Sequence, residues 1–167
     1  MGDEVVRIGT GFDIHRFARD RKLILGGVEI AHPLGLEGHS DADVVLHAVT
    51  DAILGALALG DIGGHFPNND PAYRNVDSAF MLAHVVKLVT ERGYSVGNVD
   101  ITVIAERPKL QPHIPEMRDK IAKVLACSVD RVSVKATTME RLGSIGREEG
   151  IAAEAVALLV PTALSDR

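Results

Sequence analysis

A long apolar stretch, residues 44–59, constrains what this chain can fold into more than any other segment. It is rich in Ala, Leu, Val and Ile and is too long for one strand, which favours a helix. Asp43, His47 and Asp51 recur every four residues, so a helix would place them above one another on one face. Carboxylates and imidazoles buried on such a helix are costly unless they are paired or bound to a metal. The stretch therefore predicts a buried helix whose polar side chains need partners.

Short β-branched or alternating runs separated by Gly and Pro surround this helix and predict a sheet. Two of them flank Gly26-Gly27, a pair typical of a hairpin turn. In residues 151–160 the side chains at both odd and even positions are apolar apart from Glu154, which indicates a strand buried on both faces. We expect strands at 5–15, 22–25, 28–31, 98–106, 131–137 and 151–160. We expect loops at 33–43 and 60–76 and helices at 44–59 (capped by Asp41 or Asp43), from Asp77 or Ser78 to Gly93, and at 112–126.

The order of these elements predicts a mixed α/β (α+β) fold of one domain over residues 1–167, with helices on one face of a single mixed β-sheet. A net charge of −5 and an aromatic content of 4% without Trp argue against a nucleic-acid partner. No apolar run is long enough to cross a bilayer, so we expect no membrane partner. The single cysteine, Cys127, excludes an internal disulfide framework and fits a reducing compartment, so we expect a cytoplasmic location.

Seven histidines are the unusual feature of the composition and direct attention to metal binding. Asp13 and His15 lie two residues apart on a predicted strand, so their side chains point to the same side. Together with His47 they could supply three ligands, and three protein ligands with one open position are typical of catalytic zinc. Asp43 or Asp51 could hydrogen-bond the other nitrogen of His47. The spacing alone fits equally well with histidines that lie in the core or on the surface without a metal.

Four segments match a known family in order and cover nearly the whole chain. They are RIGTGFDIHRF (7–17), GHSDADVVLHAVTDAILGALALGDIGGHFP (38–67), GYSVGNVDITVIAERPKLQPHIPEMR (93–118) and VKATTMERLGSIGREEGIAAEAVALL (134–159). Through them the chain resembles the 2-C-methyl-D-erythritol 2,4-cyclodiphosphate synthase family, lyases of the non-mevalonate isoprenoid pathway. The resemblance implies that 4-diphosphocytidyl-2-C-methyl-D-erythritol 2-phosphate is converted to a cyclic diphosphate and CMP when its 2-phosphate attacks its β-phosphate.

The resemblance also implies roles for individual residues. Asp13, His15 and His47 match the ligands of one Zn2+ per subunit, and Glu140 matches the ligand of a second divalent cation, Mg2+ or Mn2+. His39 and Thr138 match catalytic positions that stabilise the transition state. The matches to substrate-binding positions are Asp13, His15, His39, Ser40, Asp61, Ile62 and Gly63, the flexible loop Phe66, Pro67, Asn68, Asn69 and Asp70, and the cytidine and phosphate pocket Ala105, Glu106, Arg107, Pro108, Lys109, Leu110, Gln111, Thr137, Thr138, Met139 and Glu140.

The same resemblance implies a homotrimer with active sites at the subunit interfaces. It also implies an axial cavity for an isoprenoid diphosphate, beside Ser144 and Arg147. Relatives often carry an aromatic residue at the position of Ser144, a His at Thr10 and an Asp at Asn68. We therefore expect Arg147 to bind an anion with weak selectivity for the prenyl chain, and we expect the loop to contact substrate differently.

Two other functions are compatible with parts of the pattern. A metal-dependent phosphoester hydrolase, such as a nucleotide diphosphohydrolase, would keep both metal sites but use water as the nucleophile. The sequence offers no separate general base for water, which favours a nucleophile within the substrate. A non-enzymatic trimeric protein that binds nucleotide or prenyl diphosphates would tolerate loss of the metal ligands, yet all of them are present.

Overall fold

The computed structural model describes residues 5–165 and contains one five-stranded sheet with a separate hairpin. The strand order is β4-β1-β7-β5-β6, in which β5 and β6 are parallel and the other neighbours are antiparallel. The sheet strands are β1 (Arg7–Ala18), β4 (Gly35–Leu36), β5 (Tyr94–Ile104), β6 (Val132–Thr137) and β7 (Gly150–Pro161). The hairpin consists of β2 (Leu23–Leu25) and β3 (Val28–Ile30) around the predicted Gly-Gly turn.

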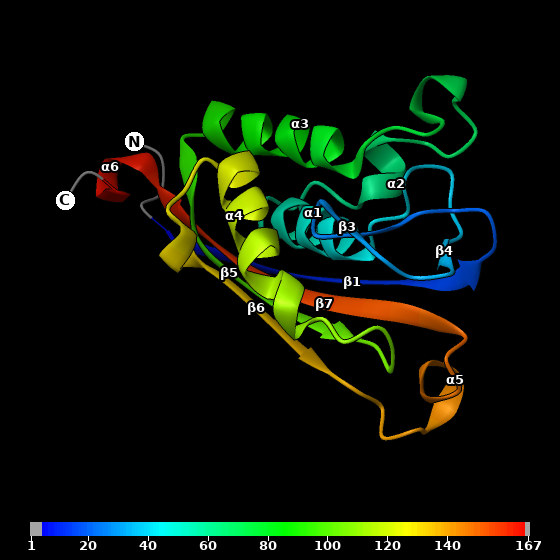
Figure 1. Cartoon of the computed structure of the whole chain (residues 1–167). Coiled ribbons are helices and arrows are strands. Elements are labelled where there is room, and N and C mark those ends of the chain that lie inside the picture. The colour runs from blue at the N-terminus through cyan, green and yellow to red at the C-terminus, as the bar shows by residue number, and fades with distance from the viewer. Residues whose placement is uncertain (1–4, 166–167) are drawn as a thin grey trace.

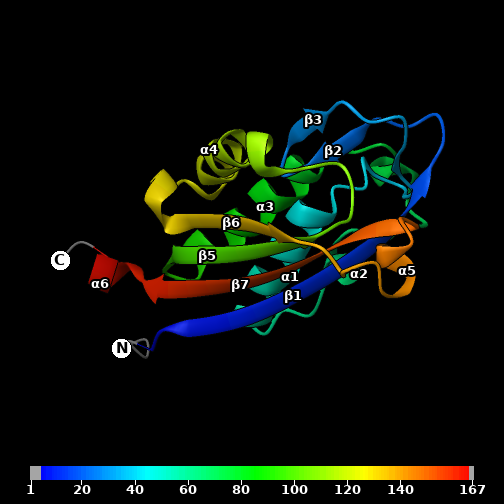
Figure 2. The ribbon, with the colours of Figure 1, turned by 60° about the horizontal axis from the view of Figure 1, so that its bottom comes forward.

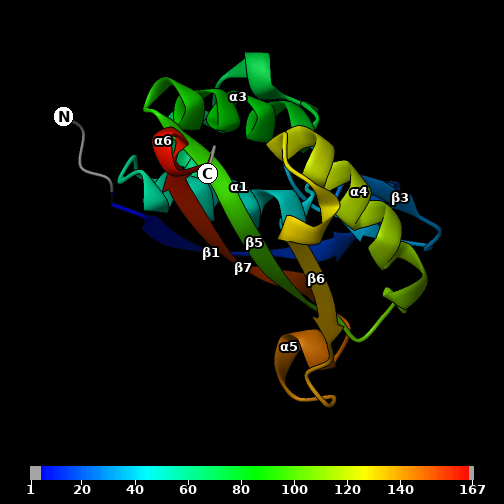
Figure 3. The same ribbon diagram turned by 90° about the vertical axis from the view of Figure 1, so that its left-hand side faces the viewer.

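Three helices cover one face of the sheet, as Figures 1 and 3 show. They are α1 (Val44–Ala56), α3 (Ser78–Glu91) and α4 (Ile114–Leu125). The predicted buried helix is α1, which lies between the sheet and α3 and is buried at every position except Asp51 and Gly55. No helix lies across the opposite face of the sheet in the described residues (Figure 2). The predicted fold class is therefore confirmed, and none of the described helices is long and apolar enough to cross a membrane.

The sequence missed several short elements. Residues 33–43 contain β4, and residues 60–76 contain α2 (Ile62–His65) and the 3-10 turn η1 (Pro71–Tyr73). Further short elements are η2 (Gln111–His113), η3 (Val129–Arg131), α5 (Gly143–Gly146) and α6 (Thr162–Ser165). Each is too short to show a hydrophobic period, and β4 exists only because it pairs with the end of β1. Pairing with neighbouring strands likewise extends β1 to Ala18 and lets β5 begin at Tyr94, beyond their predicted limits.

Glycines bring β1 into direct contact with the backbone of α1. A Cβ atom at Gly9 would lie 2.0 Å from the carbonyl oxygen of Ala52, and one at Gly11 would lie 2.0 Å from that of Ala48. Any side chain at these positions would force the strand and the helix apart. Because alternate residues share a face of the strand, the same side of β1 presents Asp13 and His15 to the next turn of α1.

Asp43 joins the start of α1 to the hairpin. Of the two predicted capping residues it is Asp43 whose side chain accepts hydrogen bonds from the amides of Val45 and Leu46. The same carboxylate accepts from the amides of Gly26 (2.9 Å) and Gly27 (2.7 Å) in the hairpin turn. It is fully buried, so these donors replace water and fix the position at which α1 begins.

Gly11→Ala should lower the free energy of unfolding by about 1–3 kcal/mol or more, because the added methyl group meets backbone atoms that cannot rotate away. Gly55→Ala is the matched control: its Cβ would lie 3.6 Å from the nearest atom, and alanine favours the helix by about 1 kcal/mol. Urea unfolding measures both changes. Equal stability of Gly11→Ala and wild type would contradict the close contact of β1 with α1.

Candidate metal centre and active-site pocket

Asp13, His15 and His47, called here the metal triad, converge where β1 passes the second turn of α1. Oδ2 of Asp13 lies 2.9 Å from Nε2 of His15 and 2.9 Å from Nδ1 of His47, and the two nitrogens are 3.3 Å apart. Within residues 5–165 no other group of three His, Cys, Asp or Glu side chains offers ligand atoms this close together. Two imidazole nitrogens and one carboxylate oxygen form a donor set that suits Zn2+.

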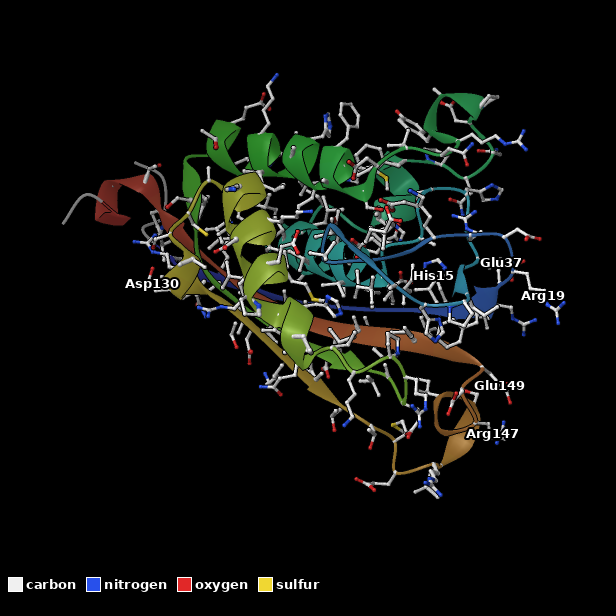
Figure 4. All side chains as sticks on the ribbon, in the orientation of Figure 1. His15, Arg19, Glu37, Asp130, Arg147 and Glu149 are labelled. Atoms are coloured by element: carbon white, nitrogen blue, oxygen red, sulfur yellow. The ribbon has the colours of Figure 1, made fainter. Side chains whose placement is uncertain are left out.

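His15 is held with one particular nitrogen toward the triad. Its Nδ1 lies 2.6 Å from the carbonyl oxygen of Glu37, and a carbonyl can only accept, so Nδ1 carries the hydrogen. Nε2 therefore points at Asp13 and His47, where it can donate to the carboxylate in the metal-free protein or give its lone pair to a cation. Figure 4 shows His15 and Glu37 at the same end of the molecule.

Two residues of the triad, Asp13 and His15, have shifted pKa values. Burial tends to raise the pKa of Asp13, but hydrogen bonds and charge from His15 and His47 outweigh it and hold that pKa well below its usual range. Burial tends to lower the pKa of His15, but its hydrogen bond with Asp13 outweighs this and raises the pKa. Asp13 and His15 thus form a partly buried ion pair beside His47 when no cation lies among them.

The predicted carboxylate partner of His47 is wrong. Asp43 is engaged in capping α1, and Oδ1 of Asp51 accepts a hydrogen bond from the amide of Ile62 at 2.7 Å. Nε2 of His47 instead lies 2.9 Å from Oγ of Ser78 and 3.2 Å from Oγ of Ser40. Helical spacing predicted three side chains on one face, but both aspartates accept hydrogen bonds from backbone amides instead of from the imidazole.

A cavity of about 200 Å³ lies beside the triad. Its lining includes nine of the predicted site residues, which come from β1, the segment before α1, α1 itself, α2 and the loop after it. They are Asp13, His15, His39, Ser40, His47, Ile62, Gly63, Phe66 and Asn68. The sequence missed Gly38, Tyr73 and Met81, which also line it. Ser40 also lines a larger hollow of about 920 Å³, which is lined by none of the triad.

The predicted substrate loop is ordered by capping and ring contacts. Asp61 caps α2 by accepting from the amide of Gly64, and Asp70 caps η1 by accepting from that of Ala72. The buried ring of Phe66 packs edge-on against Tyr73, with centroids 5.3 Å apart. Asn68 lines the cavity, whereas the predicted residues Asp61, Pro67, Asn69 and Asp70 do not.

Arg21 holds the segment that carries His39. Its guanidinium donates to the carbonyl oxygens of Gly38 (2.9 Å) and Ser40 (2.5 Å), on either side of His39. His39 itself is exposed at the edge of the cavity. Sequence reasoning missed Arg21 because its partners are backbone atoms, which no motif records.

The predicted cytidine and phosphate residues gather elsewhere, at the ends of the parallel strands β5 and β6. The amide of Ala105 donates to the carbonyl of Thr137 (3.0 Å), and Oε1 of Glu106 accepts from the amides of Met139 (2.8 Å) and Arg141 (3.2 Å). None of the residues 105–111 or 137–140 lines the cavity of the triad. Within one chain the predicted site is therefore divided into two parts.

The predicted axial residues lie on and after α5. Ser144 lines a hollow of about 250 Å³ together with Ile14, His15 and Glu149. Nε of Arg147 donates to Glu149 at 2.7 Å, and both side chains are exposed (Figure 4). An anion at Arg147 would have to compete with this carboxylate.

In metal-free protein the triad should make stability depend on pH. The stabilisation from Asp13 is present above about pH 3.8, its ordinary pKa, and is lost as the pH falls through its depressed folded pKa. The stabilisation from His15 is complete below about pH 6.5 and is lost as the pH rises through its raised folded pKa.

The melting temperature in EDTA should therefore be lower at pH 9 than at pH 6, and Asp13→Asn should flatten this difference. Asp70→Asn is the control, since Asp70 only caps the exposed turn η1. Thermal melts of the three proteins measure the effect. An Asp13→Asn protein with the wild-type pH profile would show that the cluster does not set it.

Comparisons with known proteins find similar sequences and similar structures. The YgbB family model matches residues 6–160. A relative from Geobacter sulfurreducens, named 2-C-methyl-D-erythritol 2,4-cyclodiphosphate synthase, is 61% identical over 154 residues, covering 92% of this chain and 98% of the relative. The bifunctional IspDF from Campylobacter jejuni has a TM-score of 0.91 and 43% identity, over 94% of this chain and 42% of that one. A CDP complex of IspF from Plasmodium falciparum has a TM-score of 0.83 and 38% identity, over 95% and 97% of the two chains.

Proposed function

The chain belongs to the YgbB family and has the activity for which its relatives are named, 2-C-methyl-D-erythritol 2,4-cyclodiphosphate synthesis; we propose that its metal triad carries this activity with a bound Zn2+. The enzyme is a phosphorus–oxygen lyase of isoprenoid precursor biosynthesis. It converts 4-diphosphocytidyl-2-C-methyl-D-erythritol 2-phosphate to the 2,4-cyclodiphosphate and CMP. The observation that supports the proposal most directly is the convergence of two imidazole nitrogens and one carboxylate oxygen beside a cavity.

The reaction needs proximity and charge neutralisation more than a protein nucleophile, because both reacting groups belong to the substrate. A cation held by the triad supplies Lewis acidity toward a phosphate oxygen. Ser40, Ile62 and Gly63 line the cavity and would hold the methylerythritol part, while the exposed His39 at its edge would donate to a phosphate oxygen as charge develops. The cavity would thereby fold the substrate so that its 2-phosphate reaches its β-phosphate.

We place the cytidine and the second cation at the other group of residues, 105–111 and 137–140. The exposed carboxylate of Glu140 would bind Mg2+ or Mn2+ together with substrate phosphates, since one carboxylate alone cannot complete an oxygen-ligand shell. Oγ1 of Thr138 accepts from the amide of Glu140 (3.1 Å), so the two side chains are presented together. The exposed Lys109 would neutralise a phosphate.

Phosphorus NMR of the products tests the function. Wild type with the cytidylylated substrate and Mg2+ should release CMP and a cyclic diphosphate, and His47→Ala should be slower by about 100-fold or more, because metal polarisation is worth several kcal/mol. Lys87→Ala is the control, since Lys87 is exposed on α3 and pairs with Glu91. Extra Mg2+ should restore Glu140→Gln but not His47→Ala. Linear hydrolysis products would instead support the hydrolase.

We also propose that the enzyme is a homotrimer in which the two groups of site residues meet across an interface. The uncovered face of the sheet carries apolar side chains of β1 that are unusually exposed: Ile8 (70%), Phe12 (58%) and Ile14 (48%). A single chain rarely leaves such a patch in water unless it is an interface. The axial isoprenoid diphosphate and the cytoplasmic location stay predictions.

Phe12→Glu should dissociate the trimer, because it places a second carboxylate opposite Glu154, its neighbour on β7, within an apolar interface. The mass by light scattering should fall from about three chains to one, with loss of activity. Phe80→Glu is the matched control: Phe80 is 61% exposed but lies on α3, away from the sheet face. A fully active Phe12→Glu monomer would exclude sites shared between subunits.

A further inference from the structure

Ser78, the first residue of α3, connects His47 to a carboxylate that the reaction does not use. It is 1% exposed, and its Oγ lies 2.9 Å from Nε2 of His47. The same hydroxyl donates a short hydrogen bond to Oδ1 of Asp41. Asp41 stands at the end of the segment that carries His39 and Ser40. The contacts Asp41–Ser78–His47 therefore reach His47 at Nε2, the ring nitrogen that does not face Asp13.

The direction of these hydrogen bonds follows from the donors available. The Asp41 carboxylate accepts from the amides of Asp43 (3.1 Å) and Ser78 (3.2 Å) and has no hydrogen to give. Ser78 must therefore donate its single hydroxyl hydrogen to Asp41. Its oxygen is left with lone pairs that face His47, so Nε2 of His47 must carry a hydrogen and donate it to Ser78.

Ser40 also lies near Nε2 of His47, but it does not donate a hydrogen to that nitrogen. Its Oγ accepts from the amide of Ala42 at 3.0 Å and lies 3.2 Å from Nε2 of His47, farther than Ser78. If Ser40 donated to a bare Nε2, that nitrogen and Oγ of Ser78 would present lone pairs to each other at 2.9 Å, with no hydrogen between them. The arrangement in which Nε2 of His47 donates satisfies both hydroxyl groups, and on the other side of the ring Nδ1 donates to Oδ2 of Asp13 at 2.9 Å until a cation replaces that hydrogen.

We propose that Asp41 and Ser78 are positioning residues that keep a hydrogen on Nε2 of His47 and thereby reserve the lone pair of Nδ1 for the metal. The inference rests on the proposed metal site and names residues beyond its ligands. The Asp41 carboxylate, acting through Ser78, also draws the Nε2 hydrogen away from the ring, which makes the lone pair of Nδ1 more basic and a better ligand for a cation. Because Ser78 is the first residue of α3, the packing of α3 beside α1 fixes the orientation of the His47 ring.

Metal affinity gives the first test. Zinc binding, measured by competition with a chelator, should weaken by about 10- to 100-fold in Ser78→Ala and in Asp41→Asn. In Asp41→Asn the new amide can donate to Ser78, which frees the serine hydroxyl to donate to Nε2 and moves the ring hydrogen to Nδ1. Asp77→Ala is the matched control: it removes the cap of the same helix, which accepts from the amide of Ala79, and does not touch His47. Its zinc affinity should stay within about twofold of wild type; equal losses in all three variants would indicate general loosening of α3 and overturn the proposal.

The second test locates the hydrogen and needs no metal. Long-range proton–nitrogen NMR of metal-free, 15N-histidine-labelled wild type should show a hydrogen on Nε2 of His47, and Asp41→Asn should lose it. A neutral His47 in wild type with hydrogen only on Nδ1 would overturn the proposal. A hydrogen on Nε2 in a wild-type protein that binds no zinc would instead refute the proposed metal site and leave the hydrogen-bond chain intact. The wild-type measurement decides the point even if a variant fails to fold.

Discussion

The contact between β1 and the backbone of α1 is the constraint on which the site depends. Gly9 and Gly11 have no side chains to separate the strand from the helix, so the two backbones touch. Two and four residues after Gly11, the same face of the strand carries Asp13 and His15, and α1 carries His47 at the matching height. Larger residues at the glycines would move the strand outward and draw the carboxylate and imidazole away from His47. The packing of the core thus sets the distances within the metal triad.

Each imidazole of the triad is held on the side away from its partners. Nδ1 of His15 donates to the carbonyl of Glu37, and Nε2 of His47 faces Ser78. These contacts direct the other two nitrogens, Nε2 of His15 and Nδ1 of His47, toward the Asp13 oxygen. The guanidinium of Arg21 fixes the segment between Gly38 and Ser40, which forms one wall of the cavity. The polar groups around the site therefore orient its ligands before any cation or substrate arrives.

The uncovered face of the sheet and the divided site have one common explanation. Helices cover one face, whereas Phe12 and its neighbours on β1 stay exposed on the other. The residues proposed for cytidine and the second cation lie at the ends of β5 and β6 and do not line the cavity of the triad. An assembly through the uncovered face would bury the apolar patch and could bring the two groups of residues together, so stability and catalysis would depend on the same interface.

Local sequence determined most of the secondary structure and the pairing of Asp13 with His15 on one side of a strand, whereas the resemblance to the family supplied the assignment of Asp13, His15 and His47 as metal ligands. The apolar run 44–59, the Gly26-Gly27 turn and the Asp13–His15 spacing each have a local physical cause, so the helix, the hairpin and the ligand pair were predictable. Tertiary structure decided which groups surround them. Residue spacing reports the face of an element on which a side chain lies, but not the distance to groups on other elements. Asp43 and Asp51 accept hydrogen bonds from backbone amides, and Ser78, 31 residues from His47 along the chain, becomes its partner only when α3 packs beside α1.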